Sequence, residues 1–201
     1  MTQITSIVFL PLLAVINLHA EENPLLGRWG ADVRSKGGLG ALLVFEDNGT
    51  VTSTFGALVD FNYKADGKMI TMSFNDAPDK VTQPYQISGD KMVVEPAHPE
   101  NREERTRVGA AKPGTNPIVG LWKFKHDTGA VATVQYTSGG TGQLSVPMTT
   151  ETGQYKVHGK IVTLEFKGRA EPTFTLTLAG NHLTGAAEKD KPQRKFTRVD
   201  P

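Results

Sequence analysis

The residues of this chain that could act in catalysis or bind a metal are few and widely separated. None of its five histidines has a second histidine at the short spacing that a metal site within one strand or helix requires. There is no cysteine and no Gly-x-Ser-x-Gly nucleophile motif. His126 and Asp127 are adjacent, and they are the first candidates for a metal or acid–base role. The sequence therefore predicts a non-enzymatic protein with no catalytic residue, no metal site and no cofactor.

Two other polar segments resemble functional motifs. The glycine-rich Ser138–Gly142 has the composition of a phosphate-binding loop, but it aligns with a hairpin turn in the first half of the chain, so we predict a turn. Pro99–Arg105 mixes both charge signs and is predicted to be a solvated loop. His158 and His182 fall in predicted hairpin turns and are expected to face solvent.

Composition limits the classes of partner. The 201 residues include 22 basic and 21 acidic side chains, a formal net charge of +1. A balanced charge gives no long-range attraction to nucleic acid or to an anionic membrane, so neither partner is expected. With 38% hydrophobic residues the chain is able to build a packed core, and without cysteine it has no disulfides.

The first 20 residues differ from the rest of the chain. Residues 1–20 contain no Asp, Glu, Lys or Arg, and the run from Ile4 to Leu18 is mostly apolar. The run is shorter than the roughly 20 residues of a membrane span and is interrupted by Pro11, which favours a secretory signal peptide over an uncleaved anchor. We therefore expect an exported protein, periplasmic or secreted, with no stable membrane span after signal removal.

The remaining chain is an internal repeat. Asn23-Pro24-Leu25-Leu26-Gly27-Arg28-Trp29 returns as Asn116-Pro117-Ile118-Val119-Gly120-Leu121-Trp122, and these are the two tryptophans of the sequence. Later segments align as well, including Arg105–Val108 with Phe196–Val199. We assign repeat 1 to residues 23–108, a linker to 109–115 and repeat 2 to 116–201.

Each repeat has the pattern of short antiparallel strands. In repeat 1, apolar and polar residues alternate in segments that glycine, proline or Asx turns interrupt, and Asn48-Gly49 is a strong hairpin signal. We expect separate strands at 50–55 and 59–64, with a break at Gly56-Ala57-Leu58. Helical periodicity is absent, so the predicted fold class is all-β with little helix.

The repeated Gly-x-Trp has a structural explanation. A glycine and a tryptophan on the first strand, with an arginine on the last strand, close a barrel when the indole plugs one end and the guanidinium lies on its face. Within each repeat this predicts Trp29 with Arg107 and Trp122 with Arg198. The predicted closure residues are Gly27, Trp29, Arg107, Gly120, Trp122 and Arg198.

These residues resemble the closure motif of the calycin group of up-and-down barrels, which includes the lipocalins. The resemblance implies two tandem small antiparallel meander barrels, one from each repeat. Alternatively, the repeats share one sheet, as a sandwich or one large barrel. Two closure motifs favour two barrels, since one barrel needs only one.

The functional expectation is non-catalytic binding. A small apolar ligand inside a lobe, or a ligand or protein partner in the groove between lobes, fits a lipocalin-like protein. The copies are short, however, and side chains nearly fill a small eight-stranded barrel. The alternative is therefore a structural or protein-interaction module with filled barrels.

Overall fold

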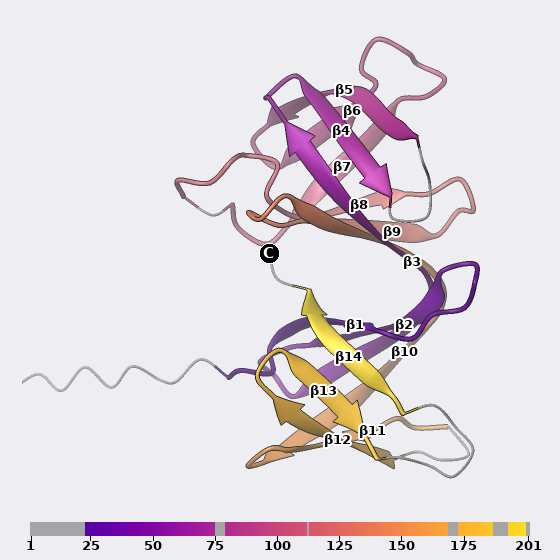
Figure 1. Cartoon of the computed structure of the whole chain (residues 1–201), viewed down its shortest axis with the longest axis vertical. Coiled ribbons are helices and arrows are strands. Elements are labelled where there is room, and N and C mark those ends of the chain that lie inside the picture. The colour runs from indigo at the N-terminus through magenta and orange to yellow at the C-terminus, as the bar shows by residue number, and fades with distance from the viewer. Residues whose placement is uncertain (1–22, 75–78, 112, 169–172, 187–192, 200–201) are drawn as a thin grey trace, which may run out of the picture.

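The structure is all-β, as the sequence predicts. The computed structural model describes residues 23–74, 79–111, 113–168, 173–186 and 193–199, and no helix occurs among them. The predicted signal peptide, residues 1–20, lies outside the described residues. Figure 1 shows the strands, whose bounds are β1 Gly27–Ala31, β2 Leu39–Phe45, β3 Thr50–Ala65, β4 Met69–Phe74, β5 Lys80–Ser88, β6 Lys91–Val94, β7 Glu103–Val108, β8 Gly120–Lys125, β9 Val131–Tyr136, β10 Thr141–His158, β11 Ile161–Glu165, β12 Thr173–Ala179, β13 His182–Gly185 and β14 Lys195–Val199.

All strand pairs are antiparallel and follow chain order in one closed ring, with β1 joined to β14. The ring is pinched where β3 and β10 pair, from Thr50 opposite Gln154 to Asn62 opposite Thr141. We call this two-stranded element the ribbon. It divides the ring into two lobes, which lie one above the other in Figure 1 with the ribbon along one side.

Each lobe takes strands from both repeats. Lobe I consists of β1, β2, the first half of β3, the second half of β10 and β11–β14. Lobe II consists of the second half of β3, β4–β9 and the first half of β10. Each lobe is thus a closed ring of strands around its own apolar core.

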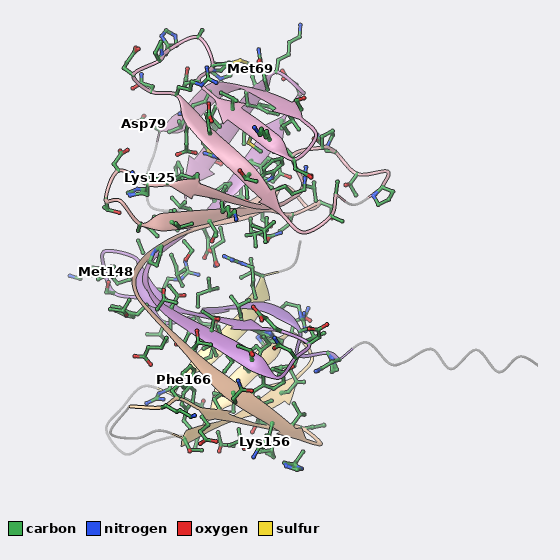
Figure 2. All side chains as sticks on the ribbon, turned by 180° about the vertical axis from the view of Figure 1, so that it is seen from behind. Met69, Asp79, Lys125, Met148, Lys156 and Phe166 are labelled. Carbon is green, nitrogen blue, oxygen red and sulfur yellow. The ribbon has the colours of Figure 1, made fainter. Side chains whose placement is uncertain are left out.

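The prediction that each repeat closes its own barrel was wrong in this respect. The expected break at Gly56 does not exist, because β3 continues from Thr50 to Ala65 and carries the chain from lobe I into lobe II. Gly56 instead lies where the ribbon bends. A Cβ there would collide with the Val146 carbonyl oxygen, and the register shifts between Pro147 and Thr149. Figure 2 shows Met148 at this bend, between the lobes.

The pairing predicted within each repeat was wrong, because each of the two arginines lies on the tryptophan of the other repeat. Arg198 pairs with Trp29 across β14–β1, and its guanidinium carbon lies 4.5 Å from the indole ring centroid. Arg107 pairs with Trp122 across β7–β8, at 4.1 Å. The exchange follows from the long ribbon, which places the last strand of one repeat beside the first strand of the other.

Gly27 and Gly120 lie against these arginines. Both have positive φ values, 110° and 133°, and the Arg107 guanidinium occupies the space that a Cβ on Gly120 would take. The predicted solvated loop at Pro99–Arg105 is also corrected, because Glu103–Val108 is β7. The Arg105 side chain is only 9% exposed and belongs to the interior of lobe II.

Candidate ligand-binding groove

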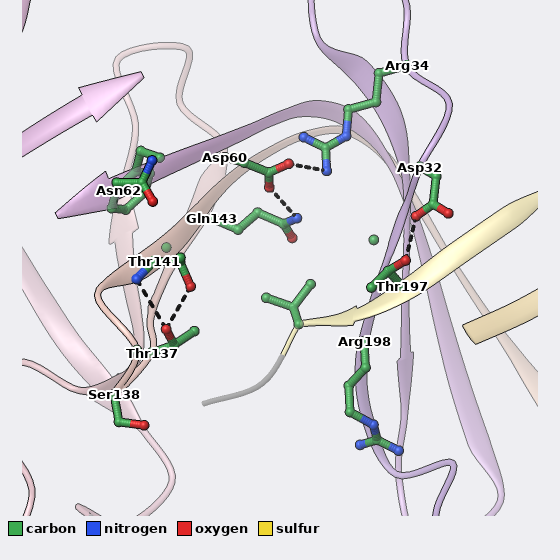
Figure 3. Close-up of a pocket in the computed structure, with 15 residues that line it drawn as sticks. Asp32, Arg34, Asp60, Asn62, Thr137, Ser138, Thr141, Gln143, Thr197 and Arg198 are labelled. Carbon is green, nitrogen blue, oxygen red and sulfur yellow. Dashed lines mark hydrogen bonds and ion pairs between the residues drawn. The ribbon is translucent and has the colours of Figure 1, made fainter. Parts of the chain in front are cut away.

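A groove with a volume of about 940 Å³ lies between the lobes. Its walls are the ends of β1 and β14 from lobe I, and β3, β10 and the turn between β9 and β10 from lobe II. Figure 3 shows that side chains from these separate elements converge on one space. This volume falls within the range of small-molecule sites.

One wall of the groove is a fixed polar network centred on Asp60. The Arg34 guanidinium forms an ion pair with Asp60 at 2.8 Å, and the Gln143 amide nitrogen donates to the other carboxylate oxygen at 2.9 Å. Arg34 also donates to the carbonyl oxygens of Ala31 and Leu58. Every side chain of the network is therefore oriented before a ligand arrives, which lowers the entropic cost of binding.

The orientation of the Gln143 amide follows from this network. A carboxylate only accepts hydrogen bonds, so the amide nitrogen must face Asp60 and the carbonyl oxygen must face away. Figure 3 shows this oxygen turned toward the open part of the groove. Gln143 is 3% exposed, and its Oε1 has no hydrogen-bond partner among the described residues. The groove thus presents a buried acceptor without a donor.

The facing wall comes from lobe I. The Thr197 hydroxyl lies 2.8 Å from a carboxylate oxygen of Asp32 and 3.2 Å from His182 Nδ1. Gly30 lies between this wall and Gln143, and a Cβ on Gly30 would lie 2.9 Å from the Gln143 amide nitrogen. The absent side chain is what leaves room for the glutamine.

The turn between β9 and β10 forms the rim. Its Thr137 and Thr141 hydroxyls lie 2.8 Å apart, and the Tyr63 hydroxyl donates to the Thr137 carbonyl oxygen at 2.7 Å. Burial, with Tyr136 and Tyr85 nearby, raises the pKa of Tyr63 to about 12, so the phenol stays protonated as a donor at neutral pH. The turn predicted at Ser138–Gly142 is thus present, with β10 beginning at Thr141. The sequence did not predict that this turn would border a groove.

Behind the groove the two lobes meet in a polar seam. Arg28 of β1 reaches from lobe I to the Thr133 hydroxyl of β9 at 3.2 Å. Burial lowers the pKa of Arg28 to about 10, which leaves it charged at neutral pH. Arg28 Nε and Gln135 Nε2 are buried without hydrogen-bond partners among the described residues. The seam brings polar groups together across the lobes, and it lies next to Gln143 on β10.

The charges that line the groove balance. Asp32 and Asp60 are matched by Arg34 and Arg198. Arg34 is paired with Asp60, while the Arg198 guanidinium donates to the carbonyl oxygens of Leu26 and Pro24 and lies on Trp29. Both cations are thus already engaged by protein groups.

Each lobe interior contains a cluster of packed, buried apolar side chains. The core of lobe I surrounds Trp29, Phe45, Phe166 and Phe196, all 5% exposed or less. Lobe II is also packed, but it contains a polar group, because Arg105 donates to the Tyr136 hydroxyl at 2.6 Å and pairs with Glu103. Burial of the Tyr136 ring raises its pKa, although the neighbouring Arg105 charge opposes this.

The histidines singled out by sequence lie apart from the groove network, except for His182. His126 Nδ1 accepts from the Thr128 backbone within an exposed turn. His158 ends β10 at an exposed hairpin. Among the described residues no group of three or more His, Cys, Asp or Glu side chains is placed to hold a metal. His182 approaches the groove only through Thr197.

Sequence analysis did not identify Arg34, Asp60, Gln143 or Thr197 as site residues. They lie on four different elements and form no local motif. In the part of the chain that the structure describes, no helix is long and apolar enough to span a membrane. Comparison with protein-family models, curated proteins and solved structures gives no match.

Proposed function

We propose that this chain is an exported, non-catalytic binding protein whose ligand occupies the groove between the lobes. The observation that carries the proposal is the buried Gln143 oxygen, which Asp60 holds toward the groove and which has no hydrogen-bond partner in the described part of the chain. A buried acceptor without a donor is unfavourable, and a ligand hydroxyl or amide would supply the missing hydrogen bond. Export rests on the apolar segment at residues 1–20.

Binding fits the groove better than catalysis. The arrangement closest to a catalytic triad is Asp32, Thr197 and His182, but the hydroxyl lies between the carboxylate and the imidazole. Nucleophilic activation needs the imidazole between the other two groups. Here the threonine proton is directed to neighbours within the wall, and this supports positioning rather than proton transfer to a substrate.

The groove also fits binding better than the lobe interiors do. The expectation of an apolar ligand inside a lobe is less well supported, because both lobe interiors hold clusters of packed, buried apolar side chains. The groove, in contrast, has oriented polar side chains in its lining, among them Asp32, Asp60 and Gln143, beside apolar surface such as Val199. We therefore place the ligand between the lobes and expect it to be polar.

Glycine amides provide the test. In ¹⁵N-labelled protein, Gly30, Gly139 and Gly142 line the groove, whereas Gly67 and Gly89 lie in open turns where a Cβ would meet no heavy atom within 4 Å. We expect a panel of hydroxyl-rich, anionic, cationic and apolar probes to include at least one that shifts the groove glycines saturably and leaves the turn glycines unchanged. Failure of every probe would contradict the proposal.

A matched pair of variants checks the location. Gly30→Val places a side chain against the Gln143 amide and should abolish the response. Val33→Met changes a nearby side chain that is 58% exposed and does not line the groove, so the response should persist. Equal responses in both variants would place the ligand elsewhere.

The second candidate is a structural or protein-interaction module, which the packed lobe interiors favour. Phe55 and Met148, at the bend of the ribbon, are 47% and 68% exposed and would serve as an apolar contact for a partner. Under this hypothesis Phe55→Ser would weaken partner capture while groove binding remained absent in the same titrations.

A further inference from the structure

We infer that the ligand of the groove is a neutral, hydroxyl-rich molecule of the carbohydrate class, such as an oligosaccharide. The inference rests on the proposed groove binding and names the chemistry of the ligand. The charge balance of the groove, the direction of its polar groups and the apolar part of its lining support it.

The charge balance disfavours a charged ligand. An anion needs a cation that is free to pair with it, but the Arg34 guanidinium is held by Asp60 and two carbonyl oxygens. Arg198 is held on Trp29 and by the carbonyls of the Asn23–Leu26 segment. For a cation, the Asp60 carboxylate is already neutralised by Arg34, and the remaining carboxylate, Asp32, already accepts from the Thr197 hydroxyl. A neutral ligand loses no hydration of a full charge on entering.

The polar groups that line the groove match hydroxyls. Gln143 Oε1 accepts only, the Asp32 carboxylate accepts, and the exposed Asn62 amide at the rim both donates and accepts. A sugar hydroxyl donates one hydrogen bond and accepts others, so neighbouring hydroxyls on a ring would satisfy acceptors and donors in the same groove. Because the network fixes the directions of the planar amide and carboxylate groups, these groups select hydroxyls that lie in matching positions on a ligand.

The apolar part of the groove lining suits the C–H face of a sugar ring. Phe61 lines the groove, and its ring takes the space that a side chain on Gly142 would fill, as the Gln143 amide does beside Gly30. Val199 adds methyl groups beside Gly30. A sugar ring presents C–H groups on its faces and hydroxyls at its edge, and this division matches the apolar and polar parts of the groove lining.

The experiment is a titration of the full-length exported protein, followed by the groove glycine amides and by calorimetry. The neutral probes are maltotriose, cellotriose and chitotriose. Sodium phosphate and glutarate test anions, putrescine tests a cation, and Nile red tests an apolar ligand. We expect at least one neutral trisaccharide to bind saturably and the charged and apolar probes not to bind in the groove.

Two glutamines make a matched pair for the mechanism. Gln143 and Gln135 are neighbours across β10–β9 and are 3% and 2% exposed, but Gln143 lines the groove and Gln135 does not. We expect Gln143→Met to weaken trisaccharide binding about tenfold, as the loss of one buried hydrogen bond of about 1.4 kcal/mol does. Gln135→Met should change it less than about twofold, since it makes no ligand contact. Asn62→Ala, at an exposed position, gives a second groove variant that leaves the core intact.

The outcomes separate the two levels of the proposal. Saturable binding of a phosphate, glutarate, putrescine or Nile red probe in the groove, without binding of any trisaccharide, would overturn the carbohydrate class and leave groove binding in place. Equal losses in Gln143→Met and Gln135→Met, with unchanged binding in Asn62→Ala, would overturn the role of the groove network. No groove response to any probe would overturn the proposed function itself.

Discussion

Lobe I and lobe II have the same frame and different interiors. In each, a tryptophan indole donates to a carbonyl oxygen four residues earlier, Trp29 to Leu25 and Trp122 to Ile118, both at 2.8 Å. Each indole is fully buried and is covered by an arginine from the neighbouring strand. The frame therefore depends on a few repeated contacts that tolerate changes elsewhere in the core.

The interiors of the two lobes differ at the positions next to the closure residues. Gly27 of lobe I is opposite Phe45, and Gly120 of lobe II is opposite Tyr136. Counting back two residues from the closing arginines gives Phe196 in lobe I and Arg105 in lobe II. Lobe I has phenylalanine at both positions, whereas lobe II has a hydrogen-bonded Arg–Tyr pair. Equivalent positions in the two barrels can therefore hold either apolar side chains or polar ones, provided that the polar side chains are hydrogen-bonded to each other.

The largest effect is expected at the closure itself. Trp29→Ala and Trp122→Ala each remove a fully buried indole and its hydrogen bond, and each should lower the free energy of unfolding by about 3 to 5 kcal/mol. Urea denaturation of the two variants measures this. Because the contacts are alike, the two losses should agree within about 1 kcal/mol. A much smaller loss in one lobe would show that its closure is not needed.

The Arg–Tyr pair of lobe II should produce the next effect. Arg105→Leu leaves the buried Tyr136 hydroxyl and the Glu103 carboxylate without their partner, and we expect a loss of about 1 to 3 kcal/mol in urea denaturation.

The residues of lobe I suggest a second variant that should restore the stability lost in Arg105→Leu. The double variant Arg105→Phe with Tyr136→Phe places phenylalanine at both positions, as Phe196 and Phe45 do in lobe I, and removes the unpaired hydroxyl. Its stability should return to within about 1 kcal/mol of the parent, since replacing a buried polar pair with packed apolar groups is often neutral. If the double variant is no more stable than Arg105→Leu, lobe II cannot accommodate the two phenylalanines that lobe I has at these positions.

The exchanged pairing of the closure residues can be measured as a coupling. A double-mutant cycle of Trp122→Leu and Arg107→Leu should give a coupling of about 1 to 2 kcal/mol, the range of a buried cation–π contact. The cycle of Trp122→Leu with Arg198→Leu should give less than about 0.5 kcal/mol, because these residues lie in different lobes. The reverse result would restore a barrel closed within each repeat.

The sequence predicts the local parts of this fold and not its long-range pairing. Alternation identifies the strands, and Asn48-Gly49 marks a real turn in which Gly49 has a φ of 83°. Alternation also says which face of a strand is buried, but not which strand lies beside it. Since both repeats have similar strands, closure within a repeat and exchange between repeats satisfy the same pattern. The single residue that distinguishes them is Gly56, which resembles a turn residue and serves instead in a bent, continuous strand.

The groove is harder to predict for the same reason. It exists because the exchange brings β14 and β1 against β3 and β10, so its residues become neighbours only after both repeats have folded together. Arg34 and Asp60 belong to no local sequence motif that would mark them as functional. A signal is present only in the glycines, because Gly30 falls in a strand where a side chain would be expected.

The smallest effect concerns alkaline pH, and it separates the lobes by their tyrosines. Burial raises the pKa values of Tyr63, Tyr85 and Tyr136 in lobe II, and of Tyr155 alone in lobe I. For Tyr63 the value is about 12 in the folded protein against 10.0 for the free side chain. Folding therefore favours the protonated phenol, and its contribution to stability is complete below pH 10 and is lost as the pH rises through 12.

Tyr63→Phe removes this titration together with the hydrogen bond to Thr137. We expect the variant to be less stable than the parent at pH 8 but to lose less stability between pH 10 and pH 12. The pH-dependent difference should stay below about 1 kcal/mol, because the ring is only partly buried and solvent screens the charge.

Tryptophan fluorescence reports each lobe separately when Trp29→Phe leaves Trp122 in lobe II and Trp122→Phe leaves Trp29 in lobe I. Since three of the four raised tyrosines lie in lobe II, the Trp122 signal should change at lower pH than the Trp29 signal. Coincident changes would mean that the shared ribbon makes the two lobes unfold as one unit, whatever their interiors contain.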